Sequence, residues 1–209
     1  MNDMTRPRPG FCSVAFKEWA GVCDALGAGR QSILLRKGGI SEEPGPGGFA
    51  PDHREFWLYP TFVHQARQGL RVAVAPMDSG PVDPAAMAIG LLARVELIAR
   101  VEDESALDEL EPYHVLTPET VRSRFHYRTP GLWVLAVRIW RHEPPYRIAA
   151  AAEHAGCKTW VTLDEPLAAS AVVPAIGEAE WAERLEELRR RFSPRPGAPP
   201  AGPDDPGVR

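Results

Sequence analysis

Two short apolar runs, separated by a loop rich in proline and glycine, constrain the fold of this chain more than any other feature. The run Gln31–Lys37 contains Ser-Ile-Leu-Leu and is bounded by glycines, and the run Glu55–Pro60 is aromatic. Both have the residue types and length of strands, and Pro60 can end the ladder of the second. Between them, Ser41–Asp52 holds three prolines and three glycines. That composition excludes a regular element, so we expect a surface loop between two strands.

Other segments carry helix and strand signals. Helical spacing of apolar residues, or a capping pair such as Thr117 and Pro118, predicts helices over residues 16–26, 61–69, 103–110, 117–125 and 181–192. β-type apolar content predicts further strands over residues 132–141 and 157–163. Residues 89–101 fit either pattern, but charged residues on the opposite face favour a strand over Arg94–Val101.

The order of these elements indicates the fold class. Helices and strands do not alternate strictly as strand–helix–strand units, so we predict an α+β fold with a mixed or largely antiparallel sheet. We expect a strongly curved sheet that closes toward a barrel, with flanking helices. An appended helix follows at the C-terminus.

Composition divides the chain into three parts. A length of 209 residues suffices for one domain with a substantial core, which we place at residues 11–167. A connector of small residues and an amphipathic helix occupy residues 168–192. Residues 193–209 are so rich in proline and glycine that we expect a disordered tail.

The C-terminal helix carries an apolar stripe that needs a cover. Burying each of Trp181, Leu185, Leu188 and Phe192 is worth about 1.5–3 kcal/mol, so the stripe will not remain in water. We favour packing on the chain's own core, which gives a monomer. A two-helix dimer seam is the alternative, although fewer than three heptads are available for a coiled coil.

Charge and cysteine content exclude several classes of protein. The net charge of −4 argues against wholesale binding of duplex DNA, but not against a local basic patch, because fields act within about 10 Å at ordinary salt. Cys12, Cys23 and Cys157 lack the CxxC spacing of a zinc site and are odd in number for a disulfide framework. No signal sequence and no apolar run of ~18 residues is present. We expect a cytoplasmic protein without a membrane partner.

A series of short motifs runs through most of the chain. They are FKEW at 16–19, CDAL at 23–26, LLRKGGI at 34–40, HREF at 53–56, YPTFVHQ at 59–65 and GCKTW at 156–160. As a set, spanning roughly residues 11 to 167, they resemble the DUF1802 family of uncharacterised bacterial proteins. The resemblance implies one intact domain and, since the family has no assigned activity, supplies no catalytic residues.

The basic turn after the first apolar run is the leading candidate site. Arg36 and Lys37, followed by Gly38 and Gly39, can present side-chain and backbone donors to a phosphate. The alternative is a tight turn with solvated charges. The sequence contains neither GxxxxGK(S/T) nor GxGxxG, so no named nucleotide-binding loop is present.

A His-Arg-Glu triplet before the aromatic run is the second candidate. His53, Glu55 and the later His64 are candidate catalytic residues, and Arg54 could hold an anion. In an extended chain His53 and Glu55 share one face and Arg54 lies opposite, so the three converge only if the backbone bends. Two histidines and a glutamate would suit zinc or iron, but their spacing is unlike HExxH, and we predict no metal site.

Three further residues complete the set of ligand-binding candidates. Lys158 can bind a phosphate while Trp160 stacks on a base, and Gln65 lies beside His64. The alternative for the first pair is a buried Trp160 next to an exposed Lys158. The alternative for His64, which lies among aromatic residues, is a place in the core.

These candidates predict a binding module for a phosphate-bearing ligand, either single-stranded nucleic acid or a nucleotide. Because the two apolar runs flank one loop, we expect a hairpin-like pairing that places Arg36, Lys37, Arg54 and Glu55 on one side of a common sheet. Two alternatives stay open. One is a metal-dependent or His/Glu-dependent nuclease or phosphohydrolase, and the other is a non-catalytic interaction protein that docks through its C-terminal helix. The sequence identifies no cofactor.

Overall fold

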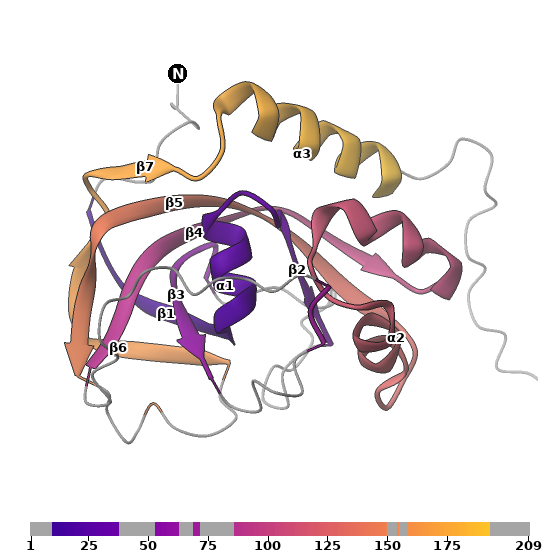
Figure 1. The fold of residues 1–209 in the computed structure, drawn as a ribbon, viewed down its shortest axis with the longest axis horizontal. Coiled ribbons are helices and arrows are strands. Elements are labelled where there is room, and N and C mark those ends of the chain that lie inside the picture. The colour runs from indigo at the N-terminus through magenta and orange to yellow at the C-terminus, as the bar shows by residue number, and fades with distance from the viewer. Residues whose placement is uncertain are drawn as a thin grey trace, which may run out of the picture.

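The structure is a computed structural model that describes residues 10–37, 53–62, 69–71, 86–149, 154 and 159–192. The strands are β1 (Phe11–Trp19), β2 (Ile33–Arg36), β3 (Glu55–Thr61), β4 (Ala86–Val101), β5 (Leu132–Ala149), β6 (Trp160–Ala168) and β7 (Val172–Pro174). The α-helices are α1 (Ala20–Gly27), α2 (Pro118–His126) and α3 (Glu178–Phe192). Figure 1 shows the strands gathered in one sheet with the helices around it.

The sheet is mostly antiparallel. Its strand order is β2-β5-β4-β3-β1-β6, and β7 pairs with β5. Among the pairings of the described strands, only β1 with β3 is parallel. This arrangement confirms the predicted α+β class and the largely antiparallel sheet. The path runs from β2 to β6 without a pairing between those two strands, so a closed barrel is not confirmed.

The first helix begins later than the sequence predicted. Phe16 and Trp19 lie in β1, and the helix starts at Ala20. β1 is buried on both faces, because Phe16 belongs to one core cluster and Ala15 to another. A strand covered on both sides loses its polar alternation, and its apolar residues can then imitate helical spacing. The predicted helix over residues 16–26 was therefore wrong in its first part.

The two strands that flank the proline- and glycine-rich loop do not pair with each other. β2 pairs with β5, whereas β3 pairs with β1 and β4, so β5 and β4 lie between β2 and β3. The predicted hairpin-like pairing was wrong, because an apolar run shows that a strand is buried but not which strand lies beside it. The predicted loop lies outside the described residues.

The long strands β4 and β5 form the most extended strand pairing of the described sheet. They pair from Ala86 with Ala149 to Val101 with Leu132, with two register shifts in β4. Both strands were predicted, although as shorter segments. The segment over residues 103–110 forms short 3₁₀ helices rather than one helix, and most of the predicted helix over 61–69 lies outside the described residues.

Helix α2 begins as its sequence predicted. Thr117 precedes the helix, its Oγ1 accepts a hydrogen bond from Thr120 N at 3.3 Å, and Pro118 takes the first position. Proline suits that position because its missing N–H would have no partner there. The start of α2 is therefore fixed by local chemistry.

Helix α3 packs along the sheet of its own chain, beside β4 and β5 (Figure 1). Trp181 and Leu188 are 2% and 0% exposed and belong to the same core cluster as the strands. Trp181 Nε1 donates to Glu96 Oε2 at 2.9 Å. The apolar stripe is thus covered within the chain, so this face is not available for a dimer seam or a docking partner. No helix in the described ranges has the length and apolar character needed to span a membrane.

Candidate functional site

Arg36, the last residue of β2, meets side chains from strands that are not its neighbours in the sheet. Its guanidinium lies over the Phe16 ring, 4.6 Å from the ring centroid. One guanidinium nitrogen lies 3.6 Å from Glu18 Oε2, and the other donates to Thr159 Oγ1 at 3.1 Å. Phe16 and Glu18 share one face of β1, and Thr159 directly precedes β6. The Arg36 side chain remains 23% exposed, so its charge can be reached from solvent.

Glu18 supplies a buried carboxylate next to Arg36. The residue is 4% exposed, and its Oε1 accepts a hydrogen bond from Trp19 N at 2.9 Å. The separation of 3.6 Å between Glu18 Oε2 and Arg36 exceeds hydrogen-bond length. An ionised carboxylate has about four acceptor positions. Within the described part of the chain, the Trp19 N–H is the one hydrogen-bond donor to this carboxylate, so Oε2 keeps capacity to accept another.

Arg124 of α2 brings a second guanidinium to the same place. It lies over the Trp19 ring at 4.3 Å and donates to Leu35 O at 3.1 Å. Burial lowers the pKa of the Arg124 guanidinium, whereas the Glu18 carboxylate raises it and Arg36 lowers it. Arginine stays charged even so. Among the described residues, two guanidinium groups therefore interact with the carboxylate of Glu18.

Aromatic rings border these charges. Trp160, the first residue of β6, contacts Phe16 and Phe56 at centroid distances of 4.9 and 5.0 Å. The exposed His53 meets Trp160 edge-on at 5.2 Å. These residues from β1, β2, β6, α2 and the segments before β3 and β6 are named the Arg36 cluster, which comprises Phe16, Glu18, Trp19, Arg36, His53, Arg124, Thr159 and Trp160. Three of the residues predicted from the sequence, Arg36, His53 and Trp160, are brought together in it.

Lys37 follows Arg36 directly, but its contacts are with backbone carbonyls of the chain itself. Its Nζ donates to Phe125 O at 2.7 Å, to Gly131 O at 2.9 Å and to Thr129 O. These carbonyls fill the three donors of an ammonium group. Burial and the nearby Arg100 lower the pKa of Lys37. The contacts tie the end of α2 to β2, and they do not support the predicted role of Lys37 as a phosphate ligand.

Glu55 lies apart from the Arg36 cluster. Its Oε2 accepts from Arg94 Nε at 3.0 Å, and the Arg94 guanidinium lies over the Trp140 ring at 5.0 Å. Glu55 shares a strand face with Trp57, whereas Phe56 faces the core cluster that contains Phe16. Arg36 and Glu55 therefore do not lie together as predicted. The exposed Arg54 is bound to β4 through its backbone, because Arg54 O accepts from Val95 N at 2.8 Å.

The predicted catalytic candidates His53 and Glu55 have different partners, Trp160 and Arg94. The other predicted residues lie outside the described ranges; they are Gly38, Gly39, His64, Gln65 and Lys158. Within those ranges, no three His, Cys, Asp or Glu side chains are grouped so that they could hold a metal ion. The hypothesis of a His/Glu-dependent enzyme thus gains no support from the described geometry.

Sequence reasoning missed Glu18 and Arg124. Glu18 was hidden because its segment had been assigned to a helix, in which a glutamate is unremarkable. A strand assignment would have placed Glu18 on the same face as the apolar Phe16. Arg124 had no such signal, because α2 reaches the cluster through tertiary packing.

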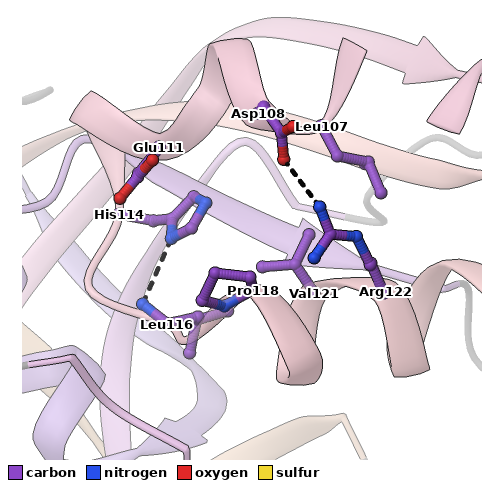
Figure 2. Close-up of a pocket in the computed structure, with 8 residues that line it drawn as sticks. All are labelled: Leu107, Asp108, Glu111, His114, Leu116, Pro118, Val121 and Arg122. Atoms are coloured by element: carbon purple, nitrogen blue, oxygen red, sulfur yellow. Dashed lines mark hydrogen bonds and ion pairs between the residues drawn. The ribbon is translucent and has the colours of Figure 1, made fainter. Parts of the chain in front are cut away.

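A small pocket between α2 and the 3₁₀ helix Asp108–Tyr113 shares no residue with the Arg36 cluster (Figure 2). Its volume of about 20 Å³ admits a water molecule but no nucleotide. His114 lines it, and His114 Nδ1 accepts from Leu116 N at 3.1 Å. Burial, together with Arg71 and Arg124, lowers the pKa of His114 to about 4. The pocket is therefore part of the framework.

The family of the chain is given by a comparison with known domain families. The model described as Domain of unknown function (DUF1802) matches residues 15–187. The chain belongs to the DUF1802 family. The match confirms the resemblance seen in the sequence motifs, and it continues beyond them through β7 and into α3. The Arg36 cluster thus lies within the DUF1802 domain.

The DUF1802 domain is also similar to solved structures. The crystal structure of ASCH from Zymomonas mobilis has 14% sequence identity and a TM-score of 0.44, with 84% of this chain and 94% of that chain covered. A mutant of the same protein has 14% identity and a TM-score of 0.44, with 86% and 98% covered. No curated protein matches the DUF1802 chain. What the site binds must therefore be argued from its own residues.

Proposed function

We propose that the Arg36 cluster binds a phosphate-bearing ligand, either a nucleotide or single-stranded nucleic acid. The observation that carries this proposal is the solvent-reachable Arg36 guanidinium beside an aromatic surface. A guanidinium has five N–H donors. Within the described residues, Arg36 makes one hydrogen bond, to Thr159. The remaining donors suit the paired oxygens of a phosphate, which arginine binds in bidentate fashion.

The charge around Arg36 supports an anionic ligand. Among the described residues, Arg36 and Arg124 share the one carboxylate of Glu18, which favours a positive cluster in a chain that carries −4 as a whole. A local cation in an acidic protein favours a ligand with a few phosphates over the continuous charge of a duplex. Each phosphate neutralised on a single strand contributes about −0.7 to the slope of log affinity against log salt.

The aromatic rings support a ligand that also carries a base. Phe16 touches both Arg36 and Trp160, so the cation and the stacking ring are separated by one side chain. His53 is exposed and lies against Trp160. Stacking a base on such a ring contributes roughly 1–3 kcal/mol and tolerates any sequence. The arrangement suits a nucleotide whose phosphate meets Arg36 while its base meets Trp160 or His53.

As part of the same proposal, the sheet is strongly curved, and this curvature assembles the site. β5, β4 and β3 separate β2 from β1 along the sheet. Neighbouring strands lie ~4.8 Å apart, so in a flat sheet β2 and β1 would be separated by on the order of 19 Å. Side chains of Arg36 and Glu18 could not reach across that distance, and their approach to 3.6 Å supports a sheet curled toward closure.

Fluorescence anisotropy of labelled oligonucleotides tests the proposal. The protein should bind a single strand more tightly than the duplex of the same sequence, with a shallow salt slope that reflects one or two phosphates. A mononucleotide should compete for the site. Absence of binding to single-stranded DNA, to single-stranded RNA and to mononucleotides would overturn the proposed function.

A further inference from the structure

Within the described residues, one oxygen of the Glu18 carboxylate receives no hydrogen bond. Glu18 Oε1 is occupied by the N–H of Trp19, whereas Oε2 has Arg36 at 3.6 Å as its ion-pair partner. Burying a charge is costly unless hydrogen bonds compensate for the lost water. At 4% exposure, Glu18 thus has fewer donors among the described residues than a buried carboxylate requires. A ligand that brings an N–H group to Oε2 would supply one.

Oε2 lies 3.6 Å from the guanidinium of Arg36, whose side chain is 23% exposed. Glu18 and Phe16 lie two residues apart on one face of β1, a separation of about 7 Å in a strand. Phe16 in turn contacts Trp160 and lies under Arg36. A base that stacks beside Trp160 can therefore direct its edge toward Glu18 while its phosphate stays near Arg36.

An ionised carboxylate discriminates between the polar groups on a base edge. It accepts hydrogen bonds and donates none, so it favours an amino group and repels a carbonyl oxygen. Glutamate and aspartate bind base amino groups in this way elsewhere. A carbonyl placed against Oε2 would set two acceptors together beside a buried charge, which gives specificity by exclusion as well as by attraction.

We infer that Glu18 is a specificity-determining residue, which accepts a hydrogen bond from the exocyclic amino group of a nucleobase held in the Arg36 cluster. The inference rests on the proposed function, since it requires a bound nucleotide. The site then prefers adenine over hypoxanthine and cytosine over uracil, because in each pair an amino group is replaced by a carbonyl. A single such contact corresponds to a roughly ten- to hundredfold difference in affinity.

Calorimetric titration of the full chain with AMP, IMP, CMP and UMP tests the inference. The wild-type protein should bind AMP and CMP roughly tenfold or more tightly than IMP and UMP. In Glu18→Gln the side-chain amide can donate as well as accept, so the preference should disappear while binding persists. The matched control is Glu55→Gln, which changes the carboxylate paired with Arg94 and should retain the preference.

The outcomes separate the inference from the function on which it rests. Equal affinities of the wild-type protein for the two members of each pair would overturn the role of Glu18 and leave nucleotide binding intact. Failure of all four nucleotides to bind would overturn the proposed function itself. If Glu18→Gln does not fold, which circular dichroism will show, the wild-type comparison still decides.

Discussion

Glu18 and Glu55 each lie beside an arginine in one sheet, but the two carboxylates differ in how they are paired. Glu55 and Arg94 are direct partners on the β3–β4 ladder, and two guanidinium nitrogens lie 3.0 Å from Glu55 Oε2. Glu18 meets Arg36 from the non-neighbouring strand β2 at 3.6 Å, with Arg124 of α2 as a second cation. The comparison teaches that the ladder pair is closed by two short contacts, whereas Glu18 and Arg36 are held at a longer distance by strands that are not neighbours.

This difference separates stability from binding. Removing one member of the Glu55–Arg94 pair should destabilise the fold, because a partly buried charge loses an ion-pair partner at 3.0 Å. Removing Arg36 should mainly weaken ligand binding, because its ion pair is long and its side chain is accessible. Four predictions test the separation, in order of decreasing effect.

The largest effect is expected for Arg94→Met. The change leaves Glu55, whose side chain is 17% exposed, without its guanidinium and removes the cation over Trp140. We expect the free energy of unfolding to fall by about 3 kcal/mol, as for other broken buried pairs. Urea unfolding measures this change. Affinity for a single strand should match that of the wild type, and a stable variant with lost binding would reverse the comparison.

Arg36→Met is expected to weaken binding more than it lowers stability. Loss of charge-assisted hydrogen bonds to a phosphate should weaken oligonucleotide binding by about 2 kcal/mol, or roughly thirtyfold. The free energy of unfolding should fall by less than in Arg94→Met, since Arg36 lies 3.6 Å from Glu18 and Arg124 also interacts with that carboxylate. Arg36→Lys keeps the charge but cannot bind a phosphate through two parallel N–H donors, so it should recover part of the affinity. Unchanged anisotropy curves would exclude Arg36 from the site.

A pH-dependent loss of stability is expected from His114, a buried group of the framework. The pKa of His114 is about 4 in the folded chain, against 6.5 ordinarily. Between those values the unfolded chain binds the proton and the folded chain does not, so stability falls as pH falls from 6.5 to 4. The loss from pH 7 to pH 5 amounts to about 2 kcal/mol.

His114→Asn provides the control for this pH dependence. The asparagine oxygen can still accept from Leu116 N, but the side chain does not titrate. Thermal midpoints of both proteins between pH 7 and pH 5 should therefore diverge, with the variant less sensitive to acid. Parallel curves would show that another group controls acid stability.

The smallest effect is expected for Lys37→Met. The ammonium binds three carbonyls around the end of α2, so its loss should lower the free energy of unfolding by about 1 kcal/mol. Oligonucleotide affinity should stay as in the wild type. A large loss of affinity in anisotropy, with normal unfolding, would place Lys37 in the site as the sequence first suggested.

The parts of the fold that the sequence predicted well are those with local signals. Thr117 and Pro118 mark the start of α2, and the apolar stripe of α3 identifies its buried face. The strand character of β2 and β3 is also local. The partners of β2 and β3 could not be predicted, because pairing depends on elements such as β5 that lie far along the chain.

The site was predictable only in its components. Arg36 and Trp160 were predicted as ligand-binding residues and His53 as a catalytic candidate, but Arg36 was combined with Lys37 because the two are adjacent in sequence. Adjacent residues of an extended chain point to opposite sides, so Lys37 reaches α2 while Arg36 reaches β1. Glu18 emerged only once β1 was seen to be a strand covered on both faces.

The indole N–H signals of the tryptophans test the central claim most directly. Nuclear magnetic resonance of the ¹⁵N-labelled protein, titrated with a short single-stranded oligonucleotide, reports on each ring separately. The account predicts that the signals of Trp160 and Trp19 in the Arg36 cluster shift, while those of Trp57 and of Trp181, which is bound to Glu96, stay in place. Shifts confined to Trp57 and its neighbours, with Trp160 unaffected, would contradict the claim that the Arg36 cluster is the binding site.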